Sequence, residues 1–141
     1  IQTIGPDKVN QLRHVRFFKD AAGVKAHMRK HAALLRPKFE AVTRVFERDL
    51  GGSGLAAWTK PRGGYFVSLD VLPGTATRVI ELAKGAGVAL APAGSAFPGK
   101  VVPEDTNIRL APSFPPLEQV SGAMEVVTVC VKLAAAEKLL A

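Results

Sequence analysis

Apolar side chains recur at intervals of three, four and seven over residues 20 to 50, the longest periodic stretch of the chain. These positions are Val24, Met28, Leu35, Phe39, Val42, Phe46 and Leu50. The spacing predicts an amphipathic helix with one continuous apolar stripe, and Asp20 is a suitable N-cap. Pro37 lies inside the stripe, so we expect either one kinked helix or two nearly collinear helices.

Three further stretches have helical patterns or helix-end signals. Asp7 follows Gly5-Pro6 and is a plausible N-cap for a helix that ends near Phe18. A second helix is predicted over 76–87, with Thr75 or Thr77 as its cap and Gly85 or Gly87 at its end. A third is predicted over 115–141, with Pro116 in its first turn. Its buried stripe would be Leu117, Val120, Met124, Val127, Val131 and Ala134.

Short apolar runs between these helices predict strands over 55–59, 65–71, 88–94 and 107–112, with a loop over 95–106. Gly and Pro clusters separate them. The predicted order is helix, helix, strand, strand, helix, strand, strand, helix. It indicates a small two-layer α/β domain whose helices pack on a short mixed sheet.

Composition narrows the classes of protein to consider. The 141 residues and 48% apolar content fit one domain with a real core, and no apolar run reaches the length of a membrane span. The single cysteine, Cys130, lies in a helical apolar pattern and is interpreted as a small buried residue, which fits a reducing, cytoplasmic compartment. The net charge of +7 comes mainly from two predicted helices, in which aromatic residues do not alternate with the basic ones as a stacking platform requires, so nucleic-acid binding is not expected.

Two patterns of catalytic or metal-binding type are weak. His27 and His31 are spaced i, i+4, which is half of a zinc motif. Arg29 and Lys30 would repel a dication, and the sequence shows neither the usual Glu nor a third ligand, so we interpret them as a polar helix face and expect no metal. Ser68 and Ser113 lack the surroundings of a hydrolase nucleophile.

Arg109 interrupts an apolar strand. Side chains alternate along a strand, so Ile108 and Leu110 share one face while Asn107 and Arg109 share the other. If the first face is the core, Arg109 faces a groove, where its planar guanidinium suits bidentate binding of a carboxylate. The alternative is an arginine in solvent on a surface strand.

The segments PRGGYFVSLD, GVALAPAGSAFPG and NIRLAPSFP, followed by a long helix, resemble the C-terminal part of fold-type-I pyridoxal-phosphate-dependent aminotransferases. TIGPDKVNQLRH and EDTNIRLAPSFPP resemble one branch more closely, the atypical bacterial, MocR-like aspartate aminotransferases. The resemblance implies that Arg109 holds the substrate's α-carboxylate, that Asn107 braces it, and that Pro112, Pro115 and Pro116 fix the chain beyond. Arg62, beside the Gly-Gly turn, is a candidate partner for a side-chain carboxylate, but an arginine in solvent is the preferred interpretation of this residue.

The resemblance also implies what this chain does not supply. The family's cofactor-binding lysine follows a serine, and this chain has no Ser-Lys pair. The chain therefore looks like a C-terminal third that begins, at Ile1, after that lysine and is inactive alone. Residues 1–20 would be the tail of the large domain and 21–141 the small domain, with no catalytic residue in either segment. Pyridoxal phosphate would be bound mainly by the large domain.

By the same resemblance, the parent protein would be a cytoplasmic homodimer that moves an amino group, with aspartate as the favoured donor, to a 2-oxo acid. Gly5, Pro6, Asp7 and Asn10 would lie at the dimer interface near the partner's active site. The alternative is a non-catalytic module: an aminotransferase-like effector domain of a transcription regulator, or another basic binding module. A winged helix upstream would favour the regulator, and a cofactor lysine alone would favour the enzyme.

Overall fold

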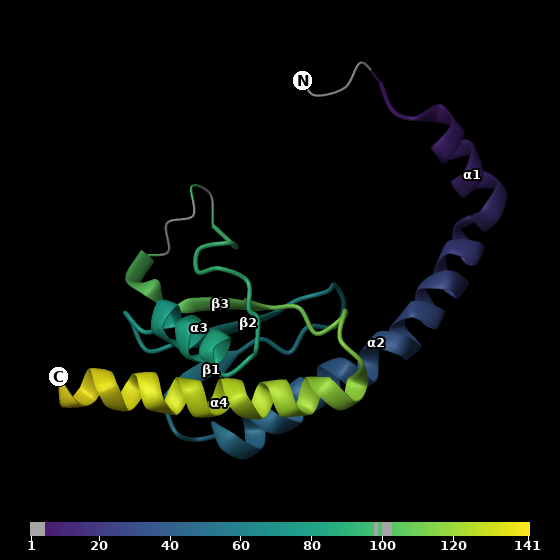
Figure 1. Cartoon of the computed structure of the whole chain (residues 1–141). Coiled ribbons are helices and arrows are strands. Elements are labelled where there is room, and N and C mark those ends of the chain that lie inside the picture. Colours follow the sequence, from purple (N-terminus) through teal and green to yellow (C-terminus); the bar gives the residue numbers. More distant parts are fainter. Residues whose placement is uncertain (1–4, 98, 100–102) are drawn as a thin grey trace. The chain divides into compact units, whose positions relative to one another are not determined.

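The computed structural model describes residues 5–97, 99 and 103–141 (Figure 1). Contacts between residues divide the chain into two units, which meet at Arg36 and Pro37 within one helix. We call the described residues up to Arg36 the N-terminal unit and those from Pro37 onward the C-terminal unit.

The N-terminal unit contains α1, Lys8–Phe18, and the first part of α2, Ala21–Asp49. Both predicted caps are confirmed. The Asp7 carboxylate accepts a hydrogen bond of 3.0 Å from the Asn10 amide, and the Asp20 carboxylate accepts one of 2.8 Å from the Gly23 amide. Helix α1 has no buried residue. Its apolar side chains therefore do not form a core within the described part of the chain.

Helix α2 is one helix of 29 residues that continues through Pro37. Of the two arrangements expected from the sequence, a single helix is therefore the one observed. Its apolar stripe is buried only beyond the proline, where Val42 and Phe46 are fully enclosed. Val24 and Met28, earlier in the same stripe, are 38% and 63% exposed. The periodic pattern predicted the helix correctly, but it did not indicate which half has a partner in this chain.

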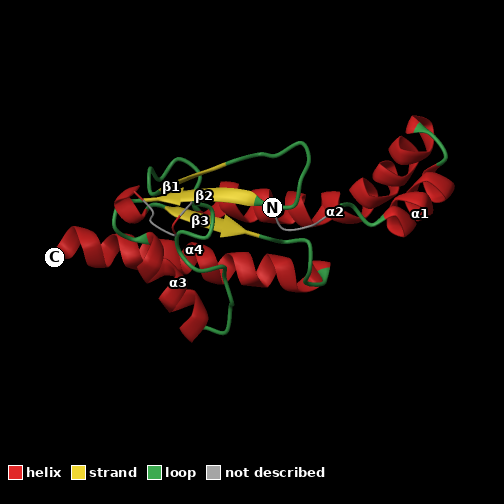
Figure 2. Cartoon of the chain, turned by 90° about the horizontal axis from the view of Figure 1, so that it is seen from above, coloured by secondary structure: helices red, strands yellow, loops and turns green. Residues whose placement is uncertain are grey.

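Three strands form the sheet, in the order β1-β2-β3: β1 is Ala56–Trp58, β2 is Val67–Val71 and β3 is Asn107–Leu110. Both pairings are antiparallel, so the described sheet is not the mixed sheet that the sequence predicted. The two-layer α/β class is confirmed, because helices cover one face of this sheet (Figure 2).

Residues 88–94 are not a strand, contrary to the prediction. The amide of Val88 bonds back to the Ala83 carbonyl at 2.8 Å, closing the preceding helix around Gly87 at φ 86°. Pro92 has no amide for a ladder, and Gly94 at φ 78° belongs to consecutive turns. In the predicted loop over 95–106, positions 98 and 100–102 lie outside the described residues, and Pro103–Asp105 form a short 3-10 helix, η2.

The core lies between the apolar face of the sheet and helices α2, α3 and α4. Helix α3 spans Ala76–Gly85 and α4 spans Leu117–Leu140; the strands lie above α4 in Figure 1. The predicted stripe of α4 is buried from Val120 onward, while Leu117 is 40% exposed. Cys130 is buried as predicted, and this burial raises the pKa of its thiol.

The single tryptophan fixes one end of this core. The Trp58 ring on β1 meets Phe46 of α2 edge to face, with 5.5 Å between the ring centroids. Its indole Nε1 is buried and has no hydrogen-bond partner among the described residues. An unpaired N–H of this kind carries a desolvation cost, which the aromatic contact and the burial of the ring offset.

Polar contacts join the helices at their ends. Arg48 of α2 bonds Glu125 of α4 at 2.9 Å, and its hydrogen bonds to Asp49 lower the pKa of that carboxyl to about 2. Arg78 of α3 forms a two-pronged pair with Glu137 of α4, at 2.8 and 2.9 Å, which lowers the pKa of Glu137. These exposed pairs orient the helices, while the apolar core supplies most of the stability.

The cap of α3 comes from a distant residue. Thr75 occupies the N-cap position, but its hydroxyl donates to the Leu72 carbonyl instead of capping the helix. The Asp105 carboxylate accepts from the Thr77 amide at 3.1 and 3.2 Å and from the Thr77 hydroxyl at 2.7 Å. The turn before β3 is thereby fastened to the start of α3.

Among the described residues, no helix combines the length and the apolar character that crossing a lipid bilayer requires.

The cap predicts a specific stability effect. Asp105→Ala should lower the free energy of unfolding by about 1 kcal/mol, because the first turn of α3 loses its acceptor. Asp105→Asn retains an acceptor oxygen and should lose clearly less. Urea unfolding followed by circular dichroism measures both changes. Glu104→Ala, which removes the neighbouring carboxylate, is the control; an equal loss in that variant would show that the cap has no special role.

Candidate functional site

The face of the sheet opposite the core carries polar side chains. Ile108 and Leu110 of β3 are 1% and 2% exposed, so alternation turns Asn107 and Arg109 to the other face, as predicted. The register pairs Arg109 with Ser68 and Asn107 with Asp70 on β2. Four polar residues therefore share a surface whose reverse side is the core. This backing holds the strand that carries Arg109 in a fixed position.

The Arg109 guanidinium lies over an aromatic ring. Its central carbon is 4.7 Å from the centroid of Phe66, within the range of a cation–π contact. Nη1 approaches the Ser95 carbonyl oxygen at 3.5 Å, which is longer than an ordinary hydrogen bond. Within the described part of the chain no carboxylate pairs with this guanidinium. A half-buried arginine that is oriented but not neutralised is available to bind an anion.

Asn107 is fixed by hydrogen bonds to the neighbouring strand. Its amide nitrogen donates to the Ser68 hydroxyl at 2.7 Å and to the Asp70 carboxylate at 2.6 Å. We expected Asn107 to brace Arg109. In the described structure no hydrogen bond joins the two side chains, and any support from Asn107 acts through the pairing of β2 and β3.

A cavity of about 350 Å³ adjoins Arg109. Arg109 is the one charged residue among those that line it, and the remainder are apolar: Val88, Ala89, Leu90, Ala91, Leu110, Ala111, Pro112, Phe114, Pro115, Val120, Ala123 and Met124. One wall is the chain that leaves β3, where Pro112 is buried and the Lys38 ammonium donates to the Ser113 carbonyl at 2.7 Å. The cavity therefore combines an apolar wall with one planar cation, which is suited to a small carboxylate with an apolar neighbouring group.

The same lining does not fit a complete pyridoxal phosphate site. Such a site needs a lysine amine, an acidic partner for the ring nitrogen and donors for the phosphate. Arg109 is the single lining residue that could contribute to any of these. The described residues near this cavity can orient a substrate, but they cannot hold the cofactor.

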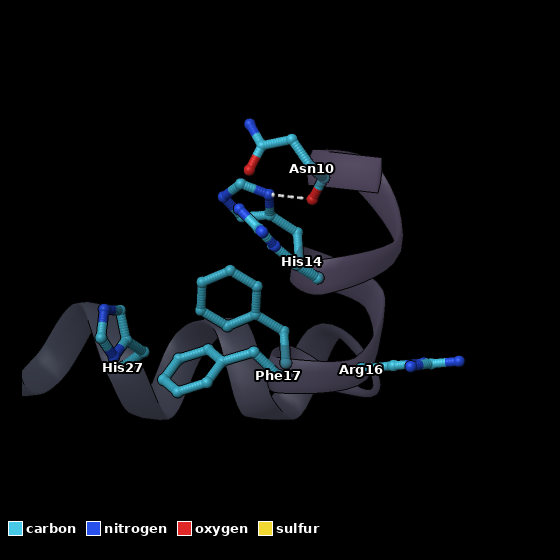
Figure 3. Close-up of a pocket in the computed structure, with 7 residues that line it drawn as sticks. Asn10, His14, Arg16, Phe17 and His27 are labelled. Carbon is cyan, nitrogen blue, oxygen red and sulfur yellow. Dashed lines mark hydrogen bonds between the residues drawn. The ribbon is translucent and has the colours of Figure 1, made fainter. Parts of the chain in front are cut away.

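The residues predicted to lie at an interface belong to the N-terminal unit. Gly5, Pro6, Asp7 and Asn10 are all exposed. Asp7 serves as the helix cap described above, and the Asn10 carbonyl oxygen lies 2.8 Å from Nδ1 of His14 (Figure 3). Arg109 belongs to the C-terminal unit, so these four residues and the Arg109 cavity lie in different units of the chain.

The N-terminal unit has an open hollow of its own, of about 720 Å³, beside which Phe17 and His27 lie close together (Figure 3). It is lined by Asn10, Arg13, His14, Arg16, Phe17, Phe18 and His27. His27 and His31 approach each other, with 2.9 Å between their Nε2 atoms. No group of three or more histidine, cysteine or acidic residues among the described residues is arranged to hold a metal ion.

Three residues near Arg109 were not singled out from the sequence as its neighbours: Phe66, Ser68 and Ser95. Alternation places Phe66, the residue before β2, on the same side as Ser68 of β2, and this signal can be read from the sequence. The strand register that sets them beside Arg109 cannot be read from the sequence, because it depends on how distant strands pair. Ser95 lies in consecutive turns, and the first of these turns overlaps the strand predicted over 88–94.

A family model for aspartate amino-transferase matches residues 1–141. An aspartate aminotransferase from Corynebacterium glutamicum is 59% identical over 137 residues, which are 97% of this chain and 32% of that protein. The crystal structure of an aspartate transaminase from the same organism has a TM-score of 0.91 at 58% identity, covering 97% of this chain and 32% of that one.

An α-aminoadipate aminotransferase from Thermus thermophilus, complexed with N-(5'-phosphopyridoxyl)-L-leucine, has a TM-score of 0.68 at 21% identity, which shows a likeness of fold alone. It covers 81% of this chain and 28% of that one. This chain thus spans about a third of the length of the relatives it matches. Because the family model covers every residue, the chain belongs to the aspartate aminotransferase family.

Proposed function

We propose that this chain is the C-terminal, substrate-orienting part of a pyridoxal-phosphate-dependent aminotransferase, in which Arg109 binds the α-carboxylate of the amino acid. One observation carries the proposal. Arg109 is half-buried beside a cavity, stacked on Phe66, and has no carboxylate partner among the described residues. A structural arginine in this setting would ordinarily be paired, because an uncompensated buried charge is costly.

The geometry also accounts for the choice of arginine. A guanidinium presents two parallel N–H donors to a carboxylate and so fixes its orientation, whereas an ammonium fixes its position alone. Phe66 holds the plane of the fork, and the buried residues on either side of Arg109 hold the strand. Placing the substrate in one orientation is the contribution that such a domain can make to the rate.

The remaining parts of the reaction belong to the rest of the parent protein. We propose that residues 1–20 are the tail of its large domain and 21–141 its small domain, and that the cofactor lysine precedes Ile1. Pyridoxal phosphate, held there, supplies the electron sink for amino-group transfer. The isolated chain is then inactive. Aspartate as donor is supported by the name of the relative from Corynebacterium glutamicum; the matching acceptor is a 2-oxo acid such as 2-oxoglutarate.

We propose a homodimer for the parent protein, placed in the cytoplasm, with Gly5, Pro6, Asp7 and Asn10 at the interface. The exposed apolar side chains of α1 support this. Val9, Leu12, Val15 and Phe17 are between 56% and 65% exposed. Soluble proteins ordinarily cover large apolar side chains that are exposed in such number on one short helix.

Replacing Arg109 tests the central assignment. In the full-length parent, Arg109→Ala should lower kcat/KM for the amino acid by roughly two to four orders of magnitude, because two charged hydrogen bonds of about 1.5–3 kcal/mol each are lost. Arg109→Lys keeps the charge without the fork and should recover part of the loss. Steady-state kinetics measure the effect, with cofactor content checked by absorbance.

Arg44, exposed on α2, provides the matched control, and Arg44→Ala should leave the kinetics unchanged. An amine without an α-carboxylate should react equally well with wild type and Arg109→Ala. If Arg109→Ala retains bound cofactor and full kcat/KM for amino acids, Arg109 is an ordinary surface residue and the assignment is wrong.

Phe66 should act as a positioning residue for Arg109. Phe66→Leu keeps apolar bulk but removes the π face, so kcat/KM should fall about two- to fivefold, equivalent to a cation–π contact of about 0.5–1 kcal/mol. Phe66→Tyr retains the face and should restore most of the activity. In the Arg109→Ala background, Phe66→Leu should have little further effect. Additive losses in that double-mutant cycle would contradict a role through Arg109.

Asn10→Arg tests the proposed interface. A bulky charge at that position should shift the full-length parent from dimer toward monomer at micromolar concentration, as measured by sedimentation velocity. Ala136→Arg, on an exposed position of α4, is the control and should leave the assembly unchanged. A parent that is monomeric and fully active before any substitution would rule out the proposed arrangement.

A further inference from the structure

His27 and His31 lie one helical turn apart on α2 and direct their Nε2 atoms at each other. The two nitrogens are 2.9 Å apart, the ring centroids are 4.5 Å apart and the ring planes are inclined by 56°. A contact between two imidazoles at this distance requires one nitrogen to donate a proton to the lone pair of the other. Two ring nitrogens therefore converge on a single shared proton.

His27 is held in place by aromatic residues of α1. Its ring meets Phe17 at 5.3 Å and 90°, and Phe18 at 5.3 Å and 70°, both edge to face. Figure 3 shows Phe17 and His27 directed toward one another across the two helices. His27 is half-buried by these contacts, while His31 is exposed. One imidazole is thus preorganised, and the other is accessible from solvent.

The separation of the two nitrogens indicates which ions fit. Metal–imidazole bonds are about 2.0–2.1 Å long, so two such ligands at a right angle lie about 2.9 Å apart, and two at a tetrahedral angle about 3.3 Å apart. The observed 2.9 Å equals the separation of neighbouring ligands on a square-planar or octahedral ion, so a rotation of each ring, without a change in the distance, would direct both lone pairs at one ion. This geometry is typical of Cu(II) and Ni(II), which also have the highest affinities for nitrogen ligands among the divalent first-row ions.

The neighbouring charges and the small number of ligands explain why the sequence pattern argued against a metal. Arg29 and Lys30 lie between the two histidines in sequence, and no third protein ligand is present among the described residues. A hard dication that needs carboxylates is disfavoured here. An ion that forms strong bonds to two neutral imidazoles tolerates this setting, because water or a small anion completes its coordination and the nearby cations favour the anion.

We infer that His27 and His31 form a two-imidazole chelating site for a Cu(II)- or Ni(II)-type cation, in which the donating imidazole moves its proton from Nε2 to Nδ1 and both Nε2 lone pairs bind the cation. The site is built by α1 and α2 of the N-terminal unit alone. It requires neither Arg109 nor the cofactor, so its test does not depend on the proposed function.

The test is titration of the full-length protein, freed of metals with EDTA, with CuCl₂ or NiCl₂ in a calorimeter. Wild type should bind one equivalent, with Cu(II) tighter than Ni(II) and Zn(II) weaker than Cu(II). His31→Ala changes an exposed side chain and should weaken binding at least about tenfold, the range seen when the surroundings of metal ligands are altered. His27→Ala should weaken binding similarly. The dissociation constant of the double variant should exceed that of either single variant by no more than a few-fold.

His14→Ala is the matched control, because His14 is an exposed histidine of the same unit whose Nδ1 contacts a backbone carbonyl oxygen. It should bind Cu(II) as wild type does. The electron paramagnetic resonance spectrum of the Cu(II) complex should show coupling to two nitrogens, and to one in His31→Ala. No stoichiometric Cu(II) binding by wild type, or equal affinity and an unchanged spectrum in His31→Ala, would overturn the inference.

Discussion

The burial of Ile108 and Leu110 is the constraint from which the candidate site follows. Both side chains are almost fully enclosed between the sheet and the helices. Because side chains alternate along a strand, the burial of these two side chains places Arg109 on the opposite face of the sheet. A slip of the register by one residue would bury the guanidinium and expose two large apolar groups, at a cost of several kcal/mol. The packing of the core therefore sets the face of the sheet on which Arg109 lies.

Local signals in the sequence were sufficient for the helices and for the face that Arg109 occupies. Asp7 and Asp20 marked helix starts because an N-cap bonds an amide only a few residues away. The failures arose where distant residues decide the structure. The run 88–94 is apolar enough for a strand, but Gly87 and Gly94 at positive φ turn the chain before it can pair. The sheet is consequently antiparallel rather than mixed.

The surroundings of Arg109 were harder to predict than Arg109 itself. Its contact with Phe66 joins segments separated by the whole of α3, whereas its contact with Ser95 spans 14 residues and the cap that Asp105 gives to α3 spans 28 residues. Such contacts depend on register and on the path of turns, neither of which has a local pattern. Likewise, nothing in the spacing of His27 and His31 indicated that Phe17 and Phe18 would hold one of the rings.

The position of Trp58 has a practical consequence for following the folding of this chain. It is the chain's single tryptophan and lies in the C-terminal unit against Phe46. Its intrinsic fluorescence therefore reports on the enclosure of that core and is silent about α1, whereas far-ultraviolet circular dichroism also records the helices of the N-terminal unit. If the two units melt separately, these two optical signals will have different midpoints, and the difference measures how far the long helix α2 couples them.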